Sequence, residues 1–291
     1  MPDQPLAEVF GFPAGNLSPE AERYRNNKLC PYNNKVPSCT KDKANAPLGV
    51  CSIYNGDMVV ITCPVRFREN WLIVEDAARF FFPPNTPWTS IQEIRLNDAN
   101  GRSAGNIDFI LVAYDDFGEV VDFGSLEVQA VYISGNVRRP FEYYMADRVN
   151  RKDMNWTSTN VRPDYLSSSR KRLVPQMIYK GGILKAWDKK QAVAIHEDFY
   201  NTLPSLPTVG PDQADIAWLV YGLDLNKTTN QYCLTRRKIV YTLFDKALEK
   251  ISMSKPGDLD RFVSRLQGKL DEKLVNNHPP DAPTLLDLMD K

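Results

Sequence analysis

The feature that most constrains this chain is a pair of adjacent apolar segments over residues 106–135, which reads as a β-hairpin interrupted by two acids. Apolar side chains alternate along the first segment, at Ile107, Phe109, Leu111 and Ala113, and residues 120–133 form a longer, mostly apolar run. The turn between them falls at residues 115–119, where Gly118 can adopt a positive φ angle. Asp108 and Glu127 are the two acids that break the apolar pattern.

These acids suggest a metal site, because residues two apart on a strand point the same way and Gln129 therefore shares a face with Glu127. If Asp108 stands opposite Glu127, two carboxylates and an amide oxygen converge, which are ligands that Mg²⁺ prefers. A self-repelling acidic pair is a reason to expect a cation. The arrangement is similar to the PD-(D/E)xK nuclease skeleton, with Gln129 where Lys is usual. The alternative is an ordinary hairpin whose polar face meets water.

A second motif is a set of cysteines within residues 30–63, a segment rich in Pro, Asn, Lys and Gly with little periodicity. Its members are Cys30, Cys39, Cys51 and Cys63, separated by 8, 11 and 11 residues. A loop-rich segment of this length needs something to fix it, and four thiolates around one structural Zn or Fe would do so. The spacing contains no C-x2-C pair, so four unconnected cysteines remain the alternative.

Bulk properties exclude little else. The 291 residues suggest one or two domains, and 43% hydrophobic and 25% charged residues are typical of a globular chain. The formal net charge is zero, which neither indicates nor excludes a nucleic-acid partner, because charge can gather in patches. We find no 18-residue apolar run and no secretory signal pattern at the N-terminus, so the expectation is a cytoplasmic protein without a membrane partner.

Residues 136–172 form a basic insert, with nine basic residues against four acidic ones and several interleaved aromatics. This mixture is typical of a segment that follows a phosphate backbone. The candidate DNA contacts are Arg138, Arg139, Arg151, Lys152, Arg170 and Lys171. The alternative is a solvated, loop-rich insert that binds nothing.

The element pattern predicts an α/β fold. Residues 1–29 suggest a short N-terminal helix, residues 66–82 an amphipathic helix, and residues 215–225 a buried strand. We expect one α/β sandwich with a mixed central sheet flanked by helices. We expect three parts: an N-terminal segment with the cysteine subdomain at 1–66, an endonuclease-like core at 67–275 with the basic insert at 136–172, and a tail at 276–291.

Several segments resemble, in order, those of the NotI-type restriction endonucleases. They are Ala7-Glu8-Val9-Phe10-Gly11, the four cysteine contexts (Cys30-Pro31-Tyr32, Ser38-Cys39-Thr40-Lys41, Gly49-Val50-Cys51 and Thr62-Cys63-Pro64), Gly124-Ser125-Leu126-Glu127-Val128-Gln129 with Gly135, and Gln176-Met177-Ile178-Tyr179-Lys180. The resemblance covers roughly residues 7–225 with gaps, and the ordered set is specific. The chain is shorter than the relatives between the basic insert and Gln176, so a recognition sequence cannot be transferred.

The resemblance implies a PD-(D/E)xK core in a homodimeric type II restriction endonuclease of a bacterial cytoplasm, which cuts palindromic double-stranded DNA. It implies that the four cysteines bind a single structural iron, with zinc as the alternative. By position it matches the family's active-site residues to Glu93, Asp108, Glu127 and Gln129.

The expected reaction is Mg²⁺-dependent phosphodiester hydrolysis. Asp108 and Glu127 would hold Mg²⁺, Glu93 would assist, and Gln129 would orient water by hydrogen bonding without supplying charge. Lys180 is a candidate for the missing positive charge. Two other classes stay open: a non-catalytic, metal-stabilised DNA-binding protein on the same scaffold, and a redox protein that uses the cysteines, which the lack of C-x-x-C disfavours.

Overall fold

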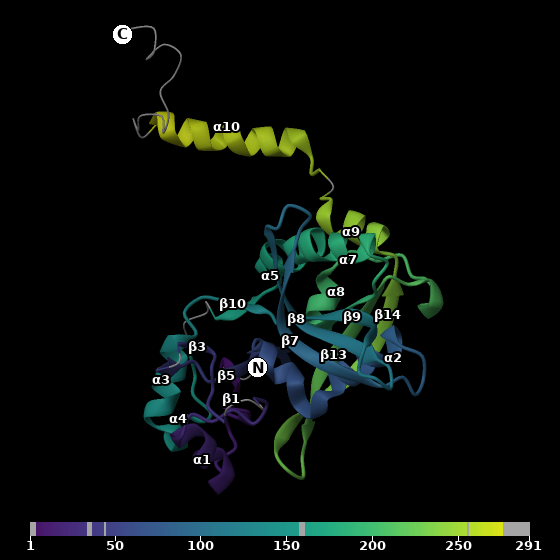
Figure 1. The fold of residues 1–291 in the computed structure, drawn as a ribbon. Coiled ribbons are helices and arrows are strands. Elements are labelled where there is room, and N and C mark those ends of the chain that lie inside the picture. The colour runs from purple at the N-terminus through teal and green to yellow at the C-terminus, as the bar shows by residue number, and fades with distance from the viewer. Residues whose placement is uncertain (1–3, 34–36, 44, 157–160, 255, 276–291) are drawn as a thin grey trace. The chain divides into compact units, whose positions relative to one another are not determined.

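The computed structural model describes residues 4–33, 37–43, 45–156, 161–254 and 256–275 (Figure 1). The chain divides into two units, Met1–Ser252 and Met253–Lys291. The second unit contains the helix α10 (Leu259–Val275), and the tail expected at 276–291 lies outside the described residues. Within the described residues, no helix combines the length and the apolar character that crossing a membrane requires.

A mixed six-stranded sheet forms the centre of the first unit, in the order β14-β13-β12-β9-β8-β7. The strands are β7 (Trp88–Asn97), β8 (Ser103–Tyr114), β9 (Val120–Gln129), β12 (Gln191–His196), β13 (Ile216–Asn226) and β14 (Gln231–Thr242). β12 runs parallel to both β9 and β13, and the other neighbours pair antiparallel. The predicted mixed central sheet is therefore confirmed, and the acidic hairpin is its β8–β9 pair.

Helices cover both faces of this sheet, which explains why the central strand β12 is buried along its whole length (Figure 1). On one face, α2 (Leu72–Phe81), preceded by the 3-10 segment η1 (Pro64–Trp71), packs Phe81 against Leu126 and Ala192. On the other face lie α8 (Glu197–Thr202) and α9 (Phe244–Ser252), whose Phe199 and Phe244 belong to a second core cluster. The alternation of β12 between these clusters divides the core into two layers.

A long helical run also lies on this second face and carries two π-helical segments. It comprises α5 (Tyr165–Ser168), η2 (Ser169–Leu173), α6 (Val174–Gln176), η3 (Met177–Gly181) and α7 (Gly182–Ala186). The sequence predicts one weakened helix here, because of Pro175 and the Gly181-Gly182 pair. The structure keeps the helix, and the π-helical segments lie on either side of the turn that holds Pro175, which has no backbone N–H to donate.

The N-terminal lobe, which we define as residues 4–61 together with 132–164, is built on a sheet of order β2-β1-β5-β6. Its strands are β1 (Leu6–Val9), β2 (Phe12–Pro13), β3 (Asp42–Lys43), β4 (Ala46–Pro47), β5 (Val50–Asn55), β6 (Met58–Ile61), β10 (Tyr132–Ser134) and β11 (Arg162–Asp164). Its helices are α1 (Pro19–Asn26), α3 (Arg138–Ala146) and α4 (Arg148–Arg151), and η4 (Pro211–Gln213) lies outside the lobe. The expectation of a helix at the very N-terminus is wrong, since residues 6–9 are a buried strand whose partners come from far along the chain.

A buried ion pair connects this lobe to the central sheet. Arg66 Nε lies 3.0 Å from Glu8 Oε1, and both side chains are fully buried. The same guanidinium donates through Nη2 to the Tyr232 carbonyl on β14, at 2.8 Å. The cysteine-bearing segment and the sheet are thus parts of one compact unit.

Candidate active site

Asp108 and Glu127 stand opposite each other on neighbouring strands. Phe109 pairs with Leu126 and Ile110 with Ser125, so one step further along the ladder Asp108 faces Glu127. Asp108 Oδ2 accepts a hydrogen bond from the Val128 backbone N–H at 2.8 Å, which fixes its carboxylate against β9. The hairpin register brings the two acids together at the end of the pairing.

Burial and the neighbouring acid raise the pKa of Glu127 to about 8, with burial the larger cause. Its side chain is 11% exposed, so water does little to stabilise the charged form. Lys180 acts in the opposite direction and lowers this pKa. Near neutral pH the carboxyl group therefore lies close to its midpoint, and a cation bound beside it would favour its ionisation.

Lys180 comes to this pair from the π-helical segment η3. Its Nζ lies 2.6 Å from Glu127 Oε1 and donates to the Asn106 carbonyl at 2.8 Å, and its side chain is 4% exposed. The lysine stem passes over Gly105, where an added Cβ would lie 3.6 Å from Lys180 Cδ and where φ is +118°. Glycine is required at that backbone conformation, so β8 and η3 approach closely here.

The amide of Gln129 is fully buried next to this pair. Its Nε2 donates a short hydrogen bond to Gln176 Oε1, while its Oε1 accepts none from the described residues. Gln176 stands four residues before Lys180, so one helix face supplies both. In the sequence, Gln176 is part of a family-like motif but is not predicted to lie at the site, although its four-residue spacing from Lys180 could have indicated that position.

Glu93 stands on β7 opposite Asp108, because Gln92 pairs with Phe109 and Ile94 with Ile107. Its φ angle is 57°, in the left-handed region that is unusual for a side chain other than glycine. The carboxylate is exposed and makes no ion pair with any described residue. The register of β7 and β8 therefore places Glu93 next to the acidic pair. Its carboxylate has no ion-pair partner among the described residues, and its backbone is strained at this point of the edge strand.

The donor set suits a hard cation. Both Glu127 oxygens and Gln129 Oε1 are buried, and the Lys180 ammonium lies against Glu127 Oε1. Glu127 Oε2 and Gln129 Oε1 accept no hydrogen bond within the described part of the chain. Buried oxygens without donors are costly, and Mg²⁺ binds such carboxylate and amide oxygens. The described residues contain no group of three or more His, Cys, Asp or Glu arranged to hold a metal ion, and this site offers two acids and one amide.

Cys30, Cys39 and Cys51 lie in the N-terminal lobe and Cys63 lies just after β6, all as free thiols. Burial, followed by the nearby Cys63 and Cys39, raises the pKa of Cys30 to about 11. The Lys41 ammonium donates to the Val50 carbonyl at 2.6 Å and the Thr62 carbonyl at 3.2 Å. Burial raises the pKa of Cys39 and of Cys51, and the Lys41 charge opposes part of that rise. The thiols therefore cluster, but among the described residues they form no coordination shell.

Packing contributes to the order of this segment. Its strands β5 and β6 belong to the four-stranded sheet, and Val50, Ile53 and Cys39 belong to an apolar cluster of the lobe. Residues 30–63 therefore have a packed core, which their loop-like composition did not indicate.

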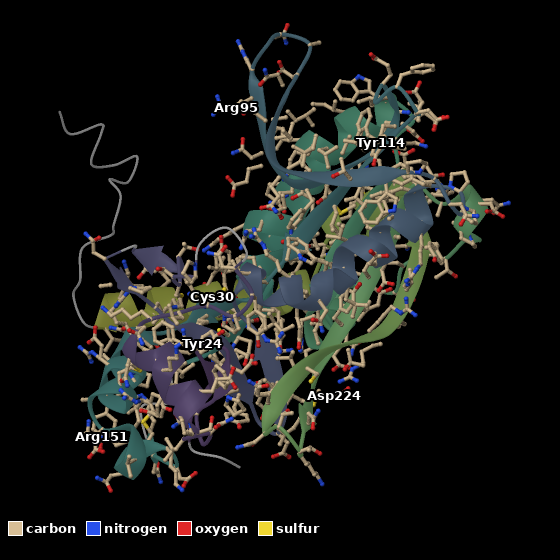
Figure 2. All side chains as sticks on the ribbon, turned by 60° about the horizontal axis from the view of Figure 1, so that its bottom comes forward. Tyr24, Cys30, Arg95, Tyr114, Arg151 and Asp224 are labelled. Carbon is tan, nitrogen blue, oxygen red and sulfur yellow. The ribbon has the colours of Figure 1, made fainter. Side chains whose placement is uncertain are left out.

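The basic candidates lie on two different parts of the chain, and Figure 2 labels one of them, Arg151. Arg138 pairs with Asp42, Arg151 donates to the Tyr143 carbonyl and covers its ring, and Lys152 lies 4.0 Å from Asp153, all in the N-terminal lobe. Arg139 is exposed in the same lobe, whereas Arg170 and Lys171 are exposed on η2, in the helical run that carries Lys180. Of the six candidates, Arg170 and Lys171 are the two that lie in the same helical run as Lys180.

A comparison with models of known protein families gives a match. The model of restriction endonuclease NotI matches residues 16–234, a range that contains Glu93, Asp108, Glu127, Gln129 and Lys180. No curated protein matches the chain. Because the match covers most of the 291 residues, the chain belongs to the NotI restriction endonuclease family.

Proposed function

We propose that this restriction endonuclease hydrolyses phosphodiester bonds of double-stranded DNA at a specific palindromic sequence, with Mg²⁺ as its catalytic ion. The observation that carries the proposal is the convergence of Asp108, Glu127, Gln129 and Lys180 on one buried spot at the β8–β9 pair. Such a site needs a cation, because the lysine carries one charge against two carboxylates.

Asp108 and Glu127 would hold Mg²⁺ in a PD-(D/E)xK core. When bound, Mg²⁺ lowers the pKa of a water molecule and neutralises charge that develops on the phosphate. Asp108 is fixed for this role by the Val128 N–H, and Glu127 must give up its proton, which its raised pKa makes dependent on pH. Glu93, exposed on β7 opposite Asp108, would assist from the open side.

Gln129 and Lys180 would together fill the role of the single strand lysine that is usual in the PD-(D/E)xK skeleton. The Gln129 amide nitrogen is engaged by Gln176, which leaves its Oε1 to accept a hydrogen bond from the attacking water. Lys180 brings the positive charge from the helix and would stabilise charge on the scissile phosphate. The strand amide would orient the attacking water, and the helix ammonium would supply the positive charge.

We further propose that a homodimer cuts the two strands, because a two-fold pair of active sites matches a palindrome. The clustered thiols of Cys30, Cys39, Cys51 and Cys63 would hold one structural iron, or zinc as the alternative, after modest rearrangement. Lys41 supports this role, because its charge opposes the rise in thiol pKa that burial causes at Cys39 and Cys51, and thiolates are what bind metal.

The test is a digest of large, unmodified DNA with the purified protein and Mg²⁺, with every fragment end sequenced. Discrete ends that share one palindrome are expected, and Asp108→Ala and Glu127→Ala should abolish cutting while both variants still bind DNA. Sequence-specific binding without cutting, also with Mn²⁺ and on modified DNA, would contradict the proposal in favour of a DNA-binding protein.

A further inference from the structure

The β7–β8 hairpin continues well beyond the acidic pair. Past Glu93 and Asp108 the strands stay paired, with Arg95 opposite Asn106 and Asn97 opposite Ser103. We call residues 94–107 the distal ribbon. Figure 1 shows it rising from the edge of the sheet, and Figure 2 shows Arg95 on it.

The turn of the distal ribbon is ordered by its own acid. Asp98 Oδ1 accepts from the backbone N–H groups of Asn100 and Arg102, each at 2.8 Å. The carboxylate of Asp98 is therefore used within the turn and is less able to repel an anionic ligand. These two hydrogen bonds hold the turn in a defined conformation.

One face of the distal ribbon is anchored and the other is free. Leu96 and Ile107 are buried in a cluster with Leu184 of α7. The exposed side chains of the ribbon include Arg95, Asn97, Asn100 and Arg102, besides the apolar Ile94. Neither arginine has an ion-pair partner among the described residues. The free side is therefore positive and rich in groups that can form two parallel hydrogen bonds.

The dimensions of this element suit a DNA groove. A two-stranded β-ribbon fits the major groove, which is about 12 Å wide and 8.5 Å deep, and the minor groove at about 6 Å is too narrow. Asp108 and Arg102 are separated along β8 by six residues, or about 20 Å at 3.3 Å per residue. A phosphate at Asp108 and base edges at the turn therefore lie within one turn of duplex, about 34 Å long.

We propose that the distal ribbon enters the major groove of the DNA substrate and that Arg95 and Arg102 read guanine edges within the recognition sequence. This inference rests on the proposed function, since it places a sequence-reading element beside the catalytic acids. Arginine pairs with the O6 and N7 atoms of guanine through two hydrogen bonds, which is the commonest base-specific contact.

The ribbon is also connected to the acids by Lys180. Its Nζ contacts both the Asn106 carbonyl at the root of the ribbon and the Glu127 carboxylate. A ribbon seated on the correct sequence would hold Asn106, and therefore Lys180, in the position that the reaction needs. Lys180 would therefore couple recognition of the correct sequence to the geometry of the active site.

The test compares Arg95→Ala, Arg102→Ala, Arg95→Lys and Arg102→Lys with the unmodified enzyme, by sequencing all fragment ends and by cleavage rates on the preferred site. We expect each variant to lose about 10- to 100-fold in rate on that site and to accept other bases at one position of each half-site. Replacing guanine there by 7-deazaguanine should slow the unmodified enzyme and leave the matching variant unaffected. Arg79→Ala, on α2 at the opposite face, is the matched control and should keep both rate and preference.

Two outcomes overturn the inference. The variants keep the original sequence preference, or they lose rate equally on all sequences with a shallower salt dependence, as loss of a phosphate contact would cause. If the unmodified protein does not cut DNA, the proposed function fails. The ribbon inference is then tested by selecting, from random duplexes, the sequences that the unmodified protein and each variant bind, and by comparing their sequence preferences. Circular dichroism establishes that each variant is folded.

Discussion

Glu127 is the residue whose environment departs furthest from that of an ordinary carboxylate. It is nearly buried, faces Asp108 across the hairpin and touches Lys180 at 2.6 Å. With a pKa of about 8, it holds a proton in the folded, metal-free protein over a pH range in which the unfolded chain has released it. Folding, metal binding and reaction are therefore all linked to the protonation of this one carboxyl group.

We predict opposite pH trends for stability and metal affinity. Between about pH 4.5 and 8 the metal-free protein should lose stability as pH rises, by up to about 1.4 kcal/mol per pH unit from this group, because the folded state keeps a proton that the unfolded state has lost. Over the same range the apparent Mg²⁺ affinity should rise, by up to about tenfold per unit.

Urea unfolding and calorimetric Mg²⁺ titration across this range provide the measurements. Glu127→Gln is the matched variant, since it cannot titrate there. The difference in unfolding free energy between the unmodified protein and the variant isolates this group from the other titrating residues. A difference that does not change with pH would contradict the prediction.

Lys180 should matter for the reaction far more than an ordinary helix lysine. Lys180→Met removes the charge next to Glu127 and should lower the cleavage rate by about 10²- to 10³-fold at saturating Mg²⁺. Lys185→Met is the matched control on the next turn of the run, where the lysine pairs with Asp215 on a more exposed surface. Single-turnover cleavage assays compare the two, and equal rates for both variants would refute the role of Lys180.

At the scale of elements, the contact between α2 and the sheet positions the acidic hairpin. Gly124 on β9 lies under the Phe81 ring so closely that an added Cβ would come within 2.5 Å of ring carbons. The glycine allows the helix to seat on β9, the strand that carries Glu127 and Gln129. The position of the acids therefore depends on a packing contact on the opposite face of the sheet.

Gly124→Ala should destabilise the protein by about 1–3 kcal/mol, because the ring must shift within a packed core. Gly182→Ala is a matched control, since a Cβ at that helix position meets nothing within 4 Å and should be neutral or slightly stabilising. Urea midpoints at constant m-value measure both changes. Gly124→Ala with Phe81→Leu should recover part of the loss, and no loss in the single variant would show that the ring moves freely.

At the scale of the whole molecule, the N-terminal lobe and the central sheet belong to one unit and should unfold together. Arg66 connects Glu8 of the lobe to Glu69 of η1 and to the Tyr232 carbonyl of β14. A metal held by the four thiols would then stabilise the catalytic sheet as well as the lobe. Loss of that metal is expected to be visible in the melting of the entire unit.

Cys39→Ser should therefore lower the metal content to near zero and reduce the Tm in a single transition. Elemental analysis of the purified protein gives the metal's identity and stoichiometry, and calorimetry gives the Tm. Cys233→Ser is the matched control, because this half-buried thiol on β14 lies outside the set of four. Absence of stoichiometric metal in the unmodified protein, or a variant that retains it, would remove the metal proposal.

The sequence by itself determined the local parts of this protein. Alternating apolar residues predicted the β8–β9 hairpin and its two acids, and unbroken apolar runs predicted the buried strands, because side-chain periodicity depends only on backbone geometry. The ordered motifs also predicted the family, which the match over residues 16–234 confirms.

Tertiary structure alone decided the contacts between distant segments. Strand β1, expected as a helix, is a strand because its hydrogen-bonding partners lie at residues 50–53. The cysteine segment looked like loops because its core partners, such as Phe141 and Tyr144, come from helix α3 much later in the chain. The seating of Lys180 on Glu127, 53 residues away, follows from a helix crossing the sheet, and no spacing in the sequence encodes that contact.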